Sequence, residues 1–174
     1  KTHSSVEFSV RHMMVAKVKG NFNEFSGNIV YDAENIGNSS VSAMIKTASV
    51  DTRNERRDGH LRSDDFFSAE KFPEMKFEST KVTKSDNGFV AAGKLTVKDV
   101  TKEIEVPFEI LGVVETSRGK RMGISAEFTI NRKDYNINYS RLMDGGGLVV
   151  ADEVTIEINI EACLLYTSDA ADDR

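Results

Sequence analysis

Apolar and polar residues alternate along most of this chain, and this alternation restricts the folds that the chain can adopt. A period of two is typical of a β-strand with one face buried and the other in water. The clearest run spans residues 154–160, where Val154, Ile156, Ile158 and Ile160 alternate with polar residues. Similar runs recur through the sequence and predict about eight strands. The other inward residues are Val6, Phe8 and Val10; Phe25, Ile29 and Tyr31; Val41, Ala43 and Ile45; Met75 and Phe77; Phe89, Ala91, Gly93 and Leu95; Ile104, Val106, Phe108 and Ile110; and Met122, Ile124, Ala126, Phe128 and Ile130.

Turn-forming residues separate these runs. The segments 35–40, 86–88, 98–101 and 116–120 contain the Gly, Asn, Asp or Ser residues that tight turns favour. Short connections predict antiparallel neighbours, and closure of the sheet leaves no strand edge exposed. The sequence therefore predicts an all-β fold, an antiparallel up-and-down β-barrel of about eight strands.

Two segments interrupt the alternation. Residues 51–73 are highly charged, and Thr52 and Glu55 have the spacing of a capping box. We therefore expect a short helix over residues 56–61 that covers one mouth of the barrel. Residues 131–152 also lack alternation and include glycines at positions 145–147, which predicts a long mobile loop.

Length, charge and cysteine content limit the classes of function. The 174 residues fit one domain, and the formal charge of −5 argues against a nucleic-acid partner, because phosphate binding needs clustered cations. The single cysteine, Cys163, lies outside the predicted strands, so a disulfide framework and a Cys-based metal site are excluded. No apolar run reaches the roughly 18 residues that a membrane-spanning helix needs.

The two ends of the chain differ from the strand-forming part of the sequence. The sequence starts at Lys1 and enters a predicted strand almost at once, so we expect either that a preceding segment was removed, as a signal peptide is, or that the sequence given does not include it. Residues 163–174 follow a finished strand and show no alternation. We predict that they form a non-native or disordered tail and that the domain spans residues 1–162.

Small residues at inward positions are compatible with a cavity inside the barrel and also with a filled interior. They leave volume that a solid core would fill, but small residues also fit the taper of a filled barrel. Periodicity does not decide between these two interpretations. The residues concerned are Ala43, Ser79, Ala91, Gly93 and Ala126.

Histidine and arginine are the candidate side chains for metal binding, catalysis or headgroup recognition. The spacing of His3, His12 and His60 matches no metal-binding motif. His12 continues the inward register of its strand, which favours a hydrogen-bonded core histidine over a metal ligand, and the sequence shows no nucleophile to partner it as a catalytic base.

Arginines gather in the segment that is predicted to cover the mouth. Their guanidinium groups suit a phosphate headgroup, but interleaved acidic residues favour a self-neutralised helix face. The arginines are Arg53, Arg56, Arg57 and Arg62.

Several ordered motifs resemble the YceI-like family, and together they cover residues 2–162. In this sequence they read VEFSVRH (6–12), VKGNF (18–22), DT (51–52) with RDGHLRSDDFF (57–67), KFPEMKF (71–77), GKLTV (93–97) with VTK (100–102), INRKDY (130–135) and DEV (152–154). One departure is Tyr135-Asn136, where the family commonly has Phe-Gly. Asn tolerates a left-handed backbone better than most residues, so we expect this turn to survive.

The resemblance implies a lipocalin-like eight-stranded barrel with a long internal tunnel for a polyisoprenoid, an isoprenoid quinone or a fatty-acyl lipid. It implies no metal, no cofactor and no reaction, and an exported, periplasmic or secreted bacterial protein. A cytoplasmic location and a homodimer are left open. We therefore expect a protein that binds and carries or stores one apolar lipid.

The predicted ligand contacts combine apolar and polar side chains. We assign the lipid tail to Phe8, Val10, Phe77, Phe108, Phe128 and Ile130, and polar anchoring to His12, Arg57 and Arg132. Two alternatives remain at this stage. One is an enzyme that uses His12 or His60 as a base at the barrel mouth. The other is a filled barrel that presents its surface to a protein partner.

Overall fold

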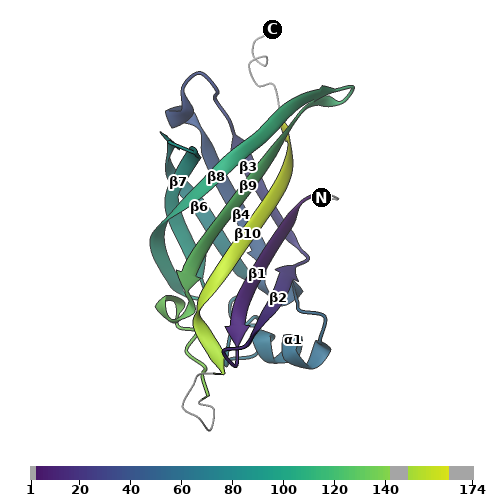
Figure 1. Cartoon of the computed structure of the whole chain (residues 1–174), viewed down its shortest axis with the longest axis vertical. Coiled ribbons are helices and arrows are strands. Elements are labelled where there is room, and N and C mark those ends of the chain that lie inside the picture. The colour runs from purple at the N-terminus through teal and green to yellow at the C-terminus, as the bar shows by residue number, and fades with distance from the viewer. Residues whose placement is uncertain (1–2, 142–148, 165–174) are drawn as a thin grey trace.

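One antiparallel sheet of ten strands curls into an elongated barrel in the computed structural model, which describes residues 3–141 and 149–164 (Figure 1). The strands follow the order β3-β4-β6-β7-β8-β9-β10-β1-β2-β5 around the sheet. No ladder between described residues joins the outer edges of β3 and β5, so hydrogen bonding surrounds most, but not all, of the wall. The strands are β1 (Ser5–His12), β2 (Ala16–Phe22), β3 (Phe25–Val30), β4 (Ser40–Lys46), β5 (Val50–Asp51), β6 (Glu74–Ser85), β7 (Gly88–Val97), β8 (Val100–Thr116), β9 (Gly119–Asn131) and β10 (Val150–Leu164).

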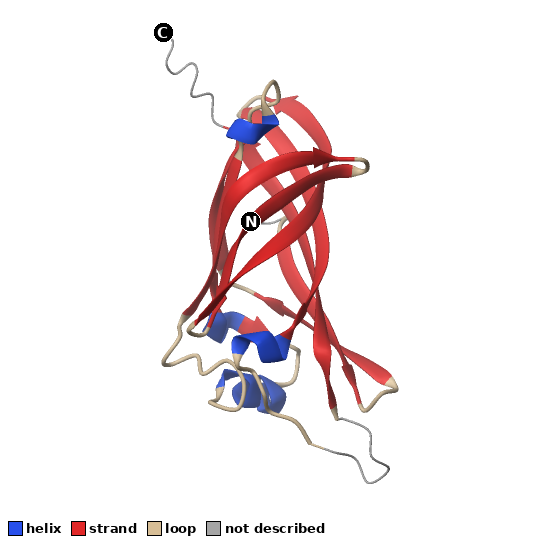
Figure 2. Ribbon diagram, turned by 90° about the vertical axis from the view of Figure 1, so that its left-hand side faces the viewer, coloured by secondary structure: helices blue, strands red, loops and turns tan. Residues whose placement is uncertain are grey.

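The helices lie at the two ends of this barrel. The α-helix α1 (Glu55–Arg62) and the short helices η2 (Thr47–Ser49) and η3 (Arg132–Tyr135) gather at one end, and η1 (Ile36–Asn38) lies at the other (Figure 2). No helix among the described residues is long and apolar enough to cross a membrane.

The predicted fold class is confirmed, but the strand number is ten rather than eight. The additional strands are β2 and β5. Gly20 interrupts the apolar face of β2, so alternation alone does not single out this strand, although the family resemblance predicts it. β5 has only two residues, which is too short to show any period.

The predicted helix at the barrel mouth is present as α1, but its N-terminal cap is different. The side chain of Asn54 is the cap and accepts a hydrogen bond of 3.0 Å from the backbone N–H of Arg57. Thr52 lies two residues before this cap, and its hydroxyl is bonded to Asp58 instead. The capping box of Thr52 and Glu55 is therefore wrong, because the helix starts after Asn54.

The prediction of a mobile loop over residues 131–152 is wrong for its first part. Asn131 caps η3, and Arg132, Tyr135 and Ile137 are only 2–6% exposed. These side chains fill the end of the barrel without any period, because a 3-10 helix and an irregular turn present them. The glycines at 145–147 lie outside the described residues, and β10 begins at Val150.

The last strand extends further than alternation predicts. β10 continues to Leu164, and Cys163 pairs in register with Arg121 of β9. The placement of Cys163 outside the strands is thus wrong, because the long strand β9 supplies backbone partners beyond residue 162. The rest of the predicted tail, residues 165–174, lies outside the described residues.

The packed core occupies the end of the barrel that carries α1. Strands, helix and the segment after η3 all contribute to it, so this end is filled by side chains. Burial of apolar surface is the dominant stabilising term in a fold of this kind. The cluster consists of Val6, Phe22, Val50, Phe66, Met75, Leu95, Val97, Tyr135 and Ile137.

The turn after η3 provides a test of the fold. Asn136 has the left-handed backbone expected from the sequence, with φ 61° and ψ 28°. A left-handed residue with a Cβ costs roughly 1–2 kcal/mol, which Asn reduces and Gly avoids. Asn136→Ala should therefore lower the free energy of unfolding by about 1 kcal/mol in urea denaturation. Asn136→Gly is the matched control and should be at least as stable as the Ala variant; equal stability of Asn136→Ala and the parent chain would contradict this account.

Candidate functional site

A cavity of about 1740 Å³ runs inside the barrel. Pockets for drug-sized ligands have volumes of roughly 300–1,000 Å³, so this cavity is large enough for a longer molecule. Residues from every strand except the two-residue β5 line it. Most of the strand side chains that line the wall are Val, Ile, Leu, Met or Phe, so the interior favours an apolar occupant.

The structure brings all of the predicted contact residues to this one cavity. The residues assigned to the lipid tail and those assigned to polar anchoring line its wall: Phe8, Val10, His12, Arg57, Phe77, Phe108, Phe128, Ile130 and Arg132. Their contact with a ligand remains a prediction. The volume of this cavity contradicts the alternative of a filled barrel, which would have no such space.

Small residues contribute to the cavity in two ways. Ala43, Ala91 and Ala126 line it and leave space beside larger neighbours, which favours the cavity over the filled barrel that periodicity had left open. Ser79 and Gly93 are not part of the lining; a Cβ atom on Gly93 would collide with the backbone oxygen of Glu78 and lie 2.7 Å from Cζ of Phe77. The glycine therefore allows the Phe77 ring to cover the backbone of the adjacent strand.

Glycine also allows a close approach where the wall meets the helical end. A Cβ atom on Gly20 would lie 2.5 Å from Cζ of Phe8 and 2.8 Å from Cγ2 of Thr52. Phe8 and Gly20 are directly paired across β1 and β2. Gly20 thus lets a cavity-lining ring and the segment before α1 pack onto the same strand.

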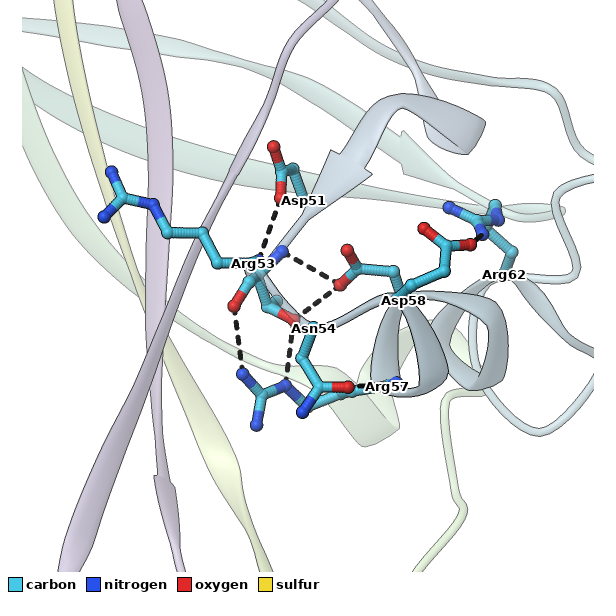
Figure 3. Close-up of polar contacts among 8 residues, drawn as sticks. Asp51, Arg53, Asn54, Arg57, Asp58 and Arg62 are labelled. Atoms are coloured by element: carbon cyan, nitrogen blue, oxygen red, sulfur yellow. Dashed lines mark hydrogen bonds and ion pairs between the residues drawn. The ribbon is translucent and has the colours of Figure 1, made fainter.

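A buried polar network fastens the start of α1 (Figure 3). The backbone N–H and the hydroxyl of Thr52 donate to Oδ1 of Asp58, and both residues are at most 5% exposed. Nε of Arg57 donates to Oγ1 of Thr52 at 2.8 Å, and Nη2 donates to its carbonyl at 3.0 Å. Because a guanidinium has five N–H donors, Arg57 retains donors for a polar headgroup.

Only one of the other arginines near α1 has the acidic partner that a self-neutralised face predicts. Nη2 of Arg62 lies 2.7 Å from Oε2 of Glu55, two turns away along the helix, whereas no ion pair of Arg53 or Arg56 occurs among the described residues. Both side chains reach solvent, so this pair contributes little to stability.

Arg132 lines the cavity and also links separate backbone segments by hydrogen bonds. Its guanidinium donates to the carbonyls of Ile137 at 2.8 Å, Ala151 at 2.9 Å and Val150 at 3.3 Å. It also lies 3.7 Å from Oδ1 of Asp152. These bonds join the segment after η3 to the start of β10 and thereby close one side of the barrel end.

Burial shifts the pKa of two residues at this end. Desolvation lowers the pKa of the Arg132 guanidinium, and the charge of Asp152 opposes that change. Burial, with a smaller contribution from Asp134, raises the pKa of the Tyr135 hydroxyl. Both shifts reflect how little water reaches this end of the barrel.

The environment of His12 differs from the one that the sequence predicts. The His12 ring is only partly buried and makes no hydrogen bond to a described residue, so the hydrogen-bonded core histidine is wrong. It ends β1, where solvent reaches the strand.

A second histidine has a partner that sequence reasoning missed. Nε2 of His60 lies 2.8 Å from Oδ2 of Asp65, and the His60 ring contacts Phe66 and Tyr139 edge to face. The pair spans the end of α1, so no helical or strand spacing points to it. No hydroxyl or thiol of a described residue forms a hydrogen bond with the His60 ring, whose partner is the Asp65 carboxylate.

No group of three or more His, Cys, Asp or Glu side chains is placed to hold a metal ion within residues 3–141 and 149–164.

Comparisons with known proteins agree with this architecture. The YceI-like domain family matches residues 1–162. A UPF0312 protein of Staphylococcus aureus is 35% identical over 161 residues, which cover 91% of this chain and 92% of that protein. The crystal structure of a Campylobacter jejuni YceI protein has 34% identity and a TM-score of 0.76, over 89% of this chain and 90% of the other.

A more distant structure shares the fold alone. A polyisoprenoid binding domain from Saccharophagus degradans, implicated in plant cell wall breakdown, has 15% identity and a TM-score of 0.65. The similarity covers 92% of this chain and 94% of that domain.

The position of Arg132 predicts a large effect on stability. Arg132→Met would leave buried carbonyls without donors, and each unsatisfied group costs roughly 1–3 kcal/mol, so we expect a loss of about 3 kcal/mol or more in urea denaturation. Lys133→Met is the matched control. Lys133 also pairs with Asp152, at 3.4 Å, but is 41% exposed, so its loss should cost less than about 1 kcal/mol. Similar values for the two variants would show that Arg132 is not a structural link.

Proposed function

The chain belongs to the YceI-like family, and from that premise we propose that it binds one long apolar lipid in the barrel cavity and carries or stores it. The observation that supports this proposal most directly is the size of the cavity, about 1740 Å³, together with its apolar wall. An apolar chain inside it gains roughly 25 cal/mol for each Å² of apolar surface removed from water. The fold shared with a polyisoprenoid binding domain adds support.

The proposed ligand is a polyisoprenoid, an isoprenoid quinone or a fatty-acyl lipid. Its tail lies along the Phe, Val and Ile residues of the strands, and its polar end lies near His12, Arg57 and Arg132. His12 pairs in register with Val150, and Arg132 donates to the carbonyl of the same residue. Two of the three polar side chains therefore converge on the start of β10.

An enzyme acting at the barrel mouth is the competing proposal. The contact between His60 and Asp65 favours it, since a carboxylate can orient an imidazole base. The described residues offer that base no nucleophile, so binding without chemistry is preferred. Turnover of a lipid ester that is lost in His60→Ala while binding persists would reverse this preference.

We also propose an exported location, periplasmic or secreted, on the basis of the family resemblance. Immunodetection in separated cell fractions tests it. Recovery of the protein only in the cytoplasmic fraction would contradict an exported location.

Native mass spectrometry of freshly purified protein tests the main proposal without assuming a ligand. We expect an added mass of one lipid per chain, which organic extraction should release as a long-chain isoprenoid, quinone or fatty-acyl compound. A clean mass of the chain alone, with no uptake when such lipids are supplied, would contradict lipid binding.

Charged substitutions in the wall test where the tail lies. Phe77→Asp and Phe128→Asp each place a carboxylate in an apolar cavity, so retained lipid should fall at least about tenfold because an unpaired charge is costly there. Leu111→Asp is the matched control, since Leu111 is 67% exposed and does not line the cavity. Circular dichroism should show that all three variants keep the strand signal; undiminished lipid in a folded Phe77→Asp variant would refute this placement.

A further inference from the structure

The turn between β1 and β2 exposes three consecutive apolar side chains. Met13 is 45% exposed, Met14 is 63% exposed and Val15 is 89% exposed. A run of exposed apolar residues on a surface is a liability unless it serves a purpose. Its location at a hairpin tip makes the surface convex.

The backbone of this turn is also unfavourable for its residues. Met13 and Met14 have φ angles of 55° and 63°, and the N–H of Val15 donates to the carbonyl of His12 at 3.3 Å. Hairpin turns with two left-handed residues favour Asn-Gly, because side chains with a Cβ are strained there. Methionine at both positions improves neither folding nor solubility, which indicates a role for the side chains themselves.

Three cationic side chains lie on the two strands that lead into and out of the apolar tip. Arg11, Lys17 and Lys19 are exposed, and Arg11 and Lys17 are directly paired across the two strands. Like charges placed opposite one another are destabilising. No ion pair to these three residues occurs within the described part of the chain, and residues 8–23 contain no Asp or Glu, although the chain has a formal charge of −5.

The tip adjoins the cavity. The N–H of Met13 donates to the carbonyl of Val149 at 2.7 Å, and both Val149 and His12 line the cavity wall. Figure 1 shows the β1–β2 hairpin turning beside the start of β10, at the same end of the barrel as α1. A surface bound by this tip would therefore lie next to the end of the cavity where the proposed polar anchors gather.

We propose that the β1–β2 tip docks on the surface of an anionic phospholipid bilayer. Met13, Met14 and Val15 enter the interfacial layer, and Arg11, Lys17 and Lys19 contact lipid phosphates. Flexible methionine side chains suit a disordered apolar environment. A second copy of the chain fits less well, because a stable dimer buries about 1,200–2,000 Å² and this tip is a convex loop of three residues.

Vesicle co-sedimentation tests docking separately from lipid binding in the cavity. The purified chain should bind vesicles containing phosphatidylglycerol at least tenfold more strongly than vesicles of phosphatidylcholine alone, and added salt should weaken that binding. The double variant Met13→Asn with Met14→Gly creates the preferred turn. It should raise the unfolding temperature, keep any cavity lipid and reduce binding to the anionic vesicles at least tenfold.

Charge and apolar controls complete the experiment. Lys17→Glu with Lys19→Glu should also reduce vesicle binding at least tenfold. The matched charge control is Lys81→Glu with Lys84→Glu, on exposed positions of β6, and the matched apolar control is Leu111→Ser with Val114→Ser, on exposed positions of β8. Both controls should bind as the parent chain does.

Three outcomes of the vesicle experiment would overturn the proposal. They are failure of the parent chain to bind anionic vesicles, unchanged binding by the Met13→Asn and Met14→Gly variant, and equal binding to neutral vesicles that salt does not affect. A dimer that depends on the tip and forms without vesicle binding would likewise overturn it. Loss of cavity lipid with vesicle binding intact would contradict the proposed function but not the docking surface.

Discussion

The pairing of β1 with β10 is the contact on which the rest of the structure depends. It joins the first and last strands, so that Val6, Phe8 and Val10 lie opposite Ile158, Ile156 and Val154. These residues line the cavity from both strands, and the adjacent ladders β1–β2 and β9–β10 extend the wall on either side. Because this contact links positions about 150 residues apart, local sequence does not encode it directly.

Polar and charged residues at the helical end act first as structural links. Asp58 and Thr52 hold α1 against the wall, and Arg132 joins η3 to β10 through backbone carbonyls. Their bonds stabilise the same end of the barrel that contains the packed apolar core. A headgroup would meet donors that the fold already holds in place, and preorganised donors lose less entropy on binding.

The cavity and the β1–β2 tip use adjacent residues for different purposes. His12 lines the cavity, whereas Met13 begins the exposed turn. If the tip lies in a bilayer interface, the end of the cavity faces the source of its proposed ligand. The turn retains a strained backbone and opposed cations, which a selection for stability alone would remove.

The sequence by itself determined the fold class, most strand positions and which side chains face inward, because a period of two distinguishes the two faces of a strand. It also placed every proposed contact residue on what became the cavity wall, from Phe8 to Arg132. Tertiary structure decided the rest. Whether small inward residues leave a cavity depends on how far the sheet curls, and the partner of a polar side chain depends on which segments meet. Asp58 with Thr52, His60 with Asp65 and Arg132 with three carbonyls arise from loops and helix ends, where no residue period exists to predict them.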